Sequence, residues 1–146
     1  MEKDAKQKVI DYLAVHLYLN LATVSRDGSP LSHTVGYVSD GAEVCFVTDK
    51  KSRKAKNIMG NPSVAYTVDE DYTDLASIKG VQMKGKANLV TDSSVIEKIL
   101  ERMVKKFPKM KEMPANPDYV FFRIVPEEAY FIDNTVGFGH RDHVDF

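Results

Sequence analysis

The sequence predicts a mostly β, α+β protein: a small antiparallel β-barrel of about six or seven strands with flanking helices. Two observations support this prediction. Short apolar segments with alternating polarity recur along the chain, and tight turns rich in glycine and aspartate join them. Because most strands follow one another directly and do not alternate with helices, a parallel dinucleotide-binding sheet is disfavoured.

Size and composition limit the function classes. The 146 residues, 43% of them hydrophobic, are enough for a single domain over 1–146 with a true core. The net charge of -1 gives no overall field that would attract nucleic acid or an anionic membrane. No apolar run approaches the ~20 residues of a membrane span, and the charged start MEKDAKQK does not resemble a signal peptide. We therefore expect a cytoplasmic protein, with its one cysteine, Cys45, buried and inert.

The N-terminal half of the chain is predicted to form a helix and then a three-stranded meander. Apolar residues at helical spacing indicate the helix, and alternation of apolar and polar residues indicates the strands. The expected elements are a helix over 3–15 and strands over 17–25, 31–39 and 43–48. The pairs Asp27-Gly28 and Asp40-Gly41 favour tight turns between these strands, since glycine adopts positive φ without strain.

The C-terminal half repeats this design around a second clear helix. The expected elements are strands over 63–68, 77–90, 119–125 and 128–134, and a helix over 92–106. Gly80 and Gly85 interrupt the long strand, which indicates a bulge, a barrel corner or a closely approaching ligand. The last residues, 135–146, are expected to form a flexible polar tail.

The stretch 42–62 carries the clearest chemical signal. An apolar strand ends at Thr48, a polar turn follows, and Ser52 can cap a short helix that carries Arg53 and Lys54. Amides at a helix start, two hydroxyls and two cations suit a phosphate group. On charge alone, a solvated basic helix is the simpler interpretation. The order of strand, turn and cap favours the phosphate site.

Other polar positions give weaker signals. His33 lies in a polar strand and is either a partly exposed strand residue or part of a ligand-facing wall. Gln82 lies between two glycines and either presents its amide to a heterocycle or is simply exposed. His140 and His143 have spacing reminiscent of a metal site, but zinc requires three or four ligands on rigid elements, so no metal site is expected.

With these features, the chain resembles the pyridoxamine 5'-phosphate oxidase-like family of flavin-binding split β-barrels. The resemblance covers nearly the whole chain. It is carried by LATVSRDGSPLSHTVGYVSDGAEVCFVTDKKSRKAKNIMGNPSVAYTV and by GVQMKGKANLV. It implies an antiparallel split β-barrel that binds flavin mononucleotide (FMN) and forms a homodimer with two flavin sites at the subunit interface.

The resemblance also implies roles for individual residues. Those assigned to the FMN phosphate are Thr48, Ser52, Arg53 and Lys54. Those on the strand along the isoalloxazine ring, partly through backbone groups, are Ser32, His33, Thr34 and Val35. The family's flavin-contacting glutamine aligns near Gly80, and Gln82 is the candidate for its role. The biosynthetic oxidase has a longer, arginine-containing C-terminal segment, whereas this chain ends in GFGHRDHVDF, which argues against pyridoxamine phosphate as the substrate.

The sequence thus predicts an FMN-dependent oxidoreductase that uses a nicotinamide donor or a small-molecule substrate, with no catalytic residue assigned. One alternative is an FMN-binding electron carrier without turnover. Another is a member of the same fold that binds a deazaflavin or haem. For haem, an axial ligand could come from His33, His140 or His143.

Overall fold

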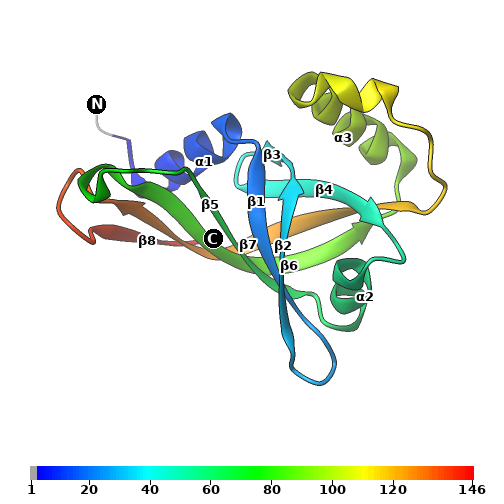
Figure 1. Ribbon diagram of the computed structural model, residues 1–146, viewed down its shortest axis with the longest axis horizontal. Helices are drawn as coiled ribbons and strands as arrows, with labels where there is room; N and C mark the ends of the chain where they lie inside the picture. The colour runs from blue at the N-terminus through cyan, green and yellow to red at the C-terminus, as the bar shows by residue number, and fades with distance from the viewer. Residues whose placement is uncertain (1–2) are drawn as a thin grey trace.

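The computed structural model describes residues 3–146, whose strands form one curled antiparallel sheet (Figure 1). The strand order is β2-β1-β5-β6-β7-β4-β3, and β8 pairs with β7. The strands are β1 (Tyr18–Val24), β2 (Pro30–Gly36), β3 (Val38–Asp40), β4 (Glu43–Asp49), β5 (Ser63–Asp69), β6 (Lys79–Val90), β7 (Tyr119–Asp133) and β8 (Arg141–Asp145). The helices are α1 (Ala5–Val15), α2 (Arg53–Gly60) and α3 (Ser93–Lys106), with 3-10 turns η1 (Leu75–Ser77) and η2 (Pro108–Glu112). This is the predicted split β-barrel.

The inside of the curl is filled by apolar side chains that alternate along each strand. Leu19 and Leu21 of β1 are fully buried, and the rings of Phe46 and Phe122 stack with centroids 5.5 Å apart. Helix α1 begins after Asp4, whose side chain accepts a hydrogen bond from the amide of Gln7. The buried faces of α1 and α2 pack onto the same core, so these helices cover the barrel. No helix within residues 3–146 is long and apolar enough to cross a membrane.

Helix α3 packs on a second, smaller apolar cluster outside the curl (Figure 1). Its Ile99 and Met103 are buried against Cys45 of β4 and Phe121 of β7. These two strand residues alternate with Phe46 and Phe122, whose side chains face the barrel core. The two clusters therefore lie on opposite faces of the same strands, and Cys45 is buried as expected.

Four features differ from the sequence-based predictions. The predicted strand over 31–39 is divided into β2 and β3 at Tyr37, whose hydroxyl donates to the Leu13 carbonyl at 2.6 Å. The two strands predicted over 119–134 are one continuous strand, β7. The prediction of a flexible tail was wrong, because residues 141–145 form β8 and pair with β7. The first helix begins at Ala5 and not at residue 3.

The continuity of β7 through Pro126 depends on Gly85 in the neighbouring strand. The register of β6 against β7 shifts between Lys84 and Gly85, where Gly85 lies opposite Pro126. A Cβ atom on Gly85 would lie 2.2 Å from the carbonyl oxygen of Val125. The glycine foreseen as a bulge or corner therefore permits a close backbone approach.

We expect Gly85→Ala to lower the free energy of unfolding by about 1–3 kcal/mol or more, because the backbone of β7 must move to admit the methyl group. Urea denaturation measures the change. Gly137→Ala is the matched control, since nothing lies within 4 Å of its added Cβ atom. Equal stability of the two variants would contradict the close approach.

Candidate functional site

The start of helix α2 gathers the side chains that the sequence assigned to a phosphate. Ser52 caps the helix, accepting a hydrogen bond from the amide of Ala55 at 3.2 Å. Its hydroxyl lies 3.1 Å from that of Thr48 at the end of β4. The ammonium of Lys54 donates to the same Thr48 hydroxyl at 3.5 Å. Two hydroxyls and a cation thus meet where a strand gives way to a helix N-terminus.

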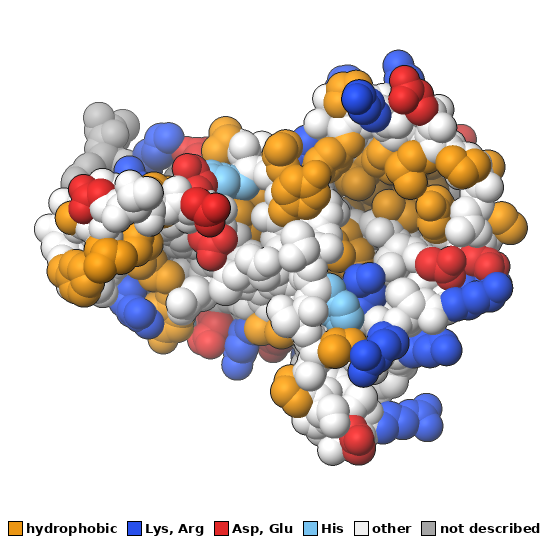
Figure 2. Space-filling view, viewed as in Figure 1, with side chains coloured by type: hydrophobic (Ala, Val, Ile, Leu, Met, Phe, Trp, Pro, Cys, Tyr) orange, Lys and Arg blue, Asp and Glu red, His pale blue; other side chains and the backbone are white. Residues whose placement is uncertain are grey.

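The basic residues around this point differ in their ion pairs. Lys50 and Lys51 both contact the carboxylate of Asp118, at 3.3 and 3.0 Å. Neither Arg53 nor Lys54 pairs with an acidic side chain in the part of the chain that the structure describes. Their charge adds to the positive end of the helix dipole. We call Thr48, Ser52, Arg53 and Lys54 the cationic corner; Figure 2 shows Lys and Arg side chains gathered over α2.

His33 of β2 is linked to β1 and to α2 through the hydroxyl of Thr23. Its Nε2 atom lies 3.2 Å from the hydroxyl of Thr23, which also accepts a hydrogen bond from the Asn57 side chain at 3.1 Å. Partial burial, and then the charges of Lys54 and Arg53, lower the pKa of His33 below its usual value. A neutral imidazole can accept at Nε2 from the Thr23 hydroxyl, while that hydroxyl accepts from the Asn57 side chain.

The other three residues proposed on this strand divide between the two faces of the sheet. Val35 is buried in the barrel core. It lies two residues after His33, and residues two apart on a strand share a face of the sheet. Ser32 and Thr34 are exposed on the opposite face, where the Thr34 hydroxyl donates to Asn20 at 3.3 Å. Strand β2 pairs only with β1 within residues 3–146, so its other edge keeps free backbone groups. Ser32 and Thr34 can therefore serve a ligand at this edge through their backbone.

Gln82 is not brought to the cationic corner within the chain. It lies on β6, which is separated from β1 by β5 in the sheet. It is in register with Thr67 of β5 and Tyr130 of β7. Its side chain is exposed on the outer face. The structure thus joins the phosphate residues and His33 but leaves Gln82 apart.

Thr23 and Asn57 contribute to the site and were not foreseen. Thr23 follows Leu19 and Leu21 at inward-facing positions of β1 and is fully buried. In the sequence, Thr23 could have been noticed as a hydroxyl at an inward position of an otherwise apolar strand face, because a buried hydroxyl needs a hydrogen-bond partner. Asn57 is one helical turn after Arg53, but its partner on β1 is 34 residues away in the chain.

An apolar cavity of about 560 Å³ adjoins this region. Its lining includes Phe107, together with Gly36 and Val47, the residues next to Val35 and Thr48. Further lining residues are Tyr18, Leu100, Met103, Lys109, Met110, Met113, Pro114, Ala115 and Tyr119. Figure 2 shows the hollow as a patch of hydrophobic side chains beneath α3. Val47 packs on the α3 cluster, whereas Val35 faces the barrel core, so this cavity lies on the α3 face of the sheet.

A split antiparallel barrel with a cationic corner and an adjoining apolar cavity has the features of a small-ligand-binding β-barrel. Comparison with known families agrees. The profile of the pyridoxamine 5'-phosphate oxidase family matches residues 5–133, and the chain belongs to this family.

Individual relatives extend this finding. General stress protein 26 of Bacillus subtilis (strain 168) is 30% identical over 127 residues, which is 87% of each chain. The structure of HutZ, the haem storage protein of Vibrio cholerae, has a TM-score of 0.73 at 22% identity, over 86% of this chain and 92% of that one. A haem-binding protein of Mycobacterium smegmatis has a TM-score of 0.85 at 14% identity; the match covers 99% of this chain and 59% of that one. At these identities the structures establish the fold alone.

We predict that Lys54→Met raises the pKa of His33, because it removes one of the two charges that oppose protonation of the imidazole. In the native protein, the neutral His33 favours the folded state above the ordinary histidine pKa, and this contribution falls as the pH drops through the lower folded pKa. Two-dimensional NMR titration of the imidazole measures the pKa of His33 in the native protein and in the variant. Lys56→Met is the control, and an equal shift in both variants would contradict the placement of Lys54.

Proposed function

We propose that this protein binds FMN, with the phosphate at the cationic corner, and acts as an FMN-dependent oxidoreductase. One observation carries the proposal. The hydroxyls of Thr48 and Ser52 and the ammonium of Lys54 converge at the start of α2. No acidic side chain within residues 3–146 neutralises Lys54 or its neighbour Arg53.

The chemistry of this donor set fits a phosphate dianion. Ser52 accepts from the Ala55 amide, and when Thr48 donates to it, the Ser52 proton is available to an anion. Arg53 can add a planar, two-pronged donor, and Lys54 a compact charge. Hydrogen bonds to charged groups contribute ~1.5–3 kcal/mol each. Three or four of them support micromolar or tighter binding after the entropy of association is subtracted.

Two further features suit a flat ring system. The free edge of β2 offers backbone donors and acceptors, and the cavity beside Gly36 and Val47 is apolar and aromatic. FMN, when bound, supplies hydride and electron transfer. The protein's part is to hold the phosphate, orient the ring along β2 and exclude water. A nicotinamide donor or another small molecule would supply the electrons.

We also propose that the protein is a homodimer, as the family resemblance implies. Gln82 is exposed on the outer face of β6, so a flavin bound at the corner of the same chain is not within its reach along the sheet. Its assigned role toward flavin therefore requires a second copy. If the protein is a monomer in solution and still binds FMN at full occupancy, Gln82 does not contact the flavin.

Haem is the principal alternative, because two structurally similar proteins are named for binding or storing haem. The histidines of this chain favour FMN. His33 is engaged with Thr23, and His143 contacts Glu128 at 3.1 Å. His140 lies 3.4 Å from Asp142. An absorption spectrum of the purified protein distinguishes flavin bands from the Soret band of haem.

We predict that Arg53→Ala combined with Lys54→Ala gives a folded but colourless protein. Removing two charge-assisted contacts costs ~3–6 kcal/mol, which weakens FMN binding by roughly 100-fold or more. Flavin absorbance and fluorescence titration with FMN measure the loss, and circular dichroism checks the fold. Lys50→Ala combined with Lys51→Ala is the matched control, because Asp118 already pairs with both lysines. A corner variant that retains FMN at full occupancy would refute the phosphate assignment.

Turnover distinguishes the oxidoreductase from an electron carrier. The FMN-loaded protein should oxidise NADH or NADPH in the presence of a suitable acceptor, and the rate should fall in the corner variant in proportion to lost flavin. Stable flavin without turnover by any donor would instead favour the carrier.

A further inference from the structure

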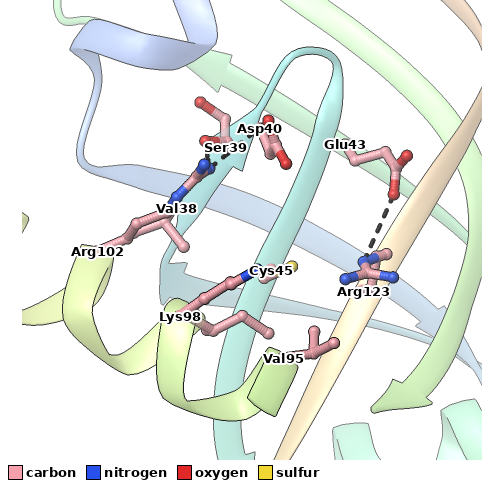
Figure 3. A pocket seen from close by; sticks show the side chains of 10 residues that line it. Val38, Ser39, Asp40, Glu43, Cys45, Val95, Lys98, Arg102 and Arg123 are labelled. Carbon is pink, nitrogen blue, oxygen red and sulfur yellow. Dashed lines mark hydrogen bonds and ion pairs between the residues drawn. The ribbon is translucent and has the colours of Figure 1, made fainter. Parts of the chain in front are cut away.

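A second cavity, of about 320 Å³, lies between α3 and the hairpin formed by β3 and β4 (Figure 3). It shares no lining residue with the apolar cavity or with the cationic corner. Its volume is at the lower end of the ~300–1,000 Å³ found for small-molecule sites. The function proposed above makes no use of it.

Cations reach this cavity from two elements. Lys98 and Arg102 lie four residues apart on α3 and so share one face of the helix. Arg123 comes from β7. Figure 3 shows the Lys98 side chain extending from α3 toward Cys45, and Arg123 on the neighbouring strand. The helix and the sheet therefore direct three positive groups toward one space.

The acidic residues of the cavity do not balance these cations. Asp40 and Glu43 oppose Lys98, Arg102 and Arg123, so three positive charges less two negative charges leave a surplus of one. The Arg102–Asp40 and Arg123–Glu43 pairs are long, at 3.7 and 3.5 Å, and join solvated side chains. Lys98 pairs with no acidic group among the described residues.

Arg102 is held in place by a neutral partner. Its Nη1 atom donates to the carbonyl of Ser39 at 3.0 Å, which fixes the guanidinium against the β3–β4 hairpin. The remaining donors of this guanidinium, and those of Arg123, keep capacity for another acceptor. Carboxylates match the planar fork of a guanidinium.

The floor of the cavity is apolar. Val38, Cys45 and Ile99 are 5%, 7% and 5% exposed, and they belong to the apolar cluster beneath α3. Burial raises the pKa of the Cys45 thiol, which keeps it neutral. A ligand in this cavity would therefore meet an apolar surface on one side and cationic groups on the other.

We propose that this cavity binds a small organic carboxylate, with its apolar body on the floor and its carboxylate at Lys98 and Arg123. A single negative charge matches the surplus of one. A phosphate dianion fits less well, because Asp40 and Glu43 lie in the same cavity and would repel the second charge. The proposal is independent of the flavin site.

Benzoate is the probe for this proposal, and benzamide is its uncharged counterpart of nearly equal shape. In NMR titrations of the full chain with FMN present, benzoate should give saturable shifts at Cys45 and Arg123. Benzamide should bind at least tenfold more weakly. Lys98→Gln should raise the Kd for benzoate about tenfold. Lys105→Gln, a change on the same helix outside the cavity lining, should leave it unchanged.

Several results would overturn the proposal. These are the absence of saturable shifts, equal affinity for benzoate and benzamide, unchanged benzoate affinity in Lys98→Gln, or shifts confined to the cationic corner. Arg123→Gln gives a second test, with the dispersion of amide resonances as the check on folding. Because Lys98 is on the surface of α3, its variant keeps the test decisive even if the β7 variant fails to fold. FMN absorbance recorded on the same samples separates this outcome from failure of the flavin proposal.

Discussion

The ion pairs of Asp118 determine the charge of the candidate site. This carboxylate contacts both Lys50 and Lys51, and these contacts hold its pKa below the usual range. The backbone carbonyl of Asp118 also accepts a hydrogen bond from the backbone amide of Lys50 at 2.8 Å. The basic stretch is thereby divided. Its first half is paired with a carboxylate just before the start of β7, whereas Arg53 and Lys54 at the helix start keep their charge for an anion.

The split in the barrel gives that charge a neighbouring surface. Because β2 pairs only with β1 in the described chain, one edge of β2 stays open beside α2. The buried hydroxyl of Thr23 joins His33 on β2 to Asn57 on α2, so strand and helix keep a fixed relation. An open edge next to a cationic helix start is suited to a ligand with an anionic tail and a flat ring.

Helix α3 separates two cavities of different chemistry. One is apolar and is lined by Phe107 and Tyr119. The other combines an apolar floor with Lys98, Arg102 and Arg123. Related folds carry names that refer to haem, so the barrel alone does not select a ligand. The side chains at each cavity make that selection.

The sequence alone determined the features that depend on neighbours close in the chain. Periodicity located most strands and helices, and the spacing from Thr48 to Lys54 foretold a capped, cationic helix start. Tertiary structure decided the features that depend on distant partners: the continuous β7, the pairing of β8, the separation of Gln82 from the corner, and the contacts of Thr23 and Asp118. The physical reason is that capping and alternation act over a few residues. Strand register and ion pairing are instead settled by contacts between segments far apart in the chain.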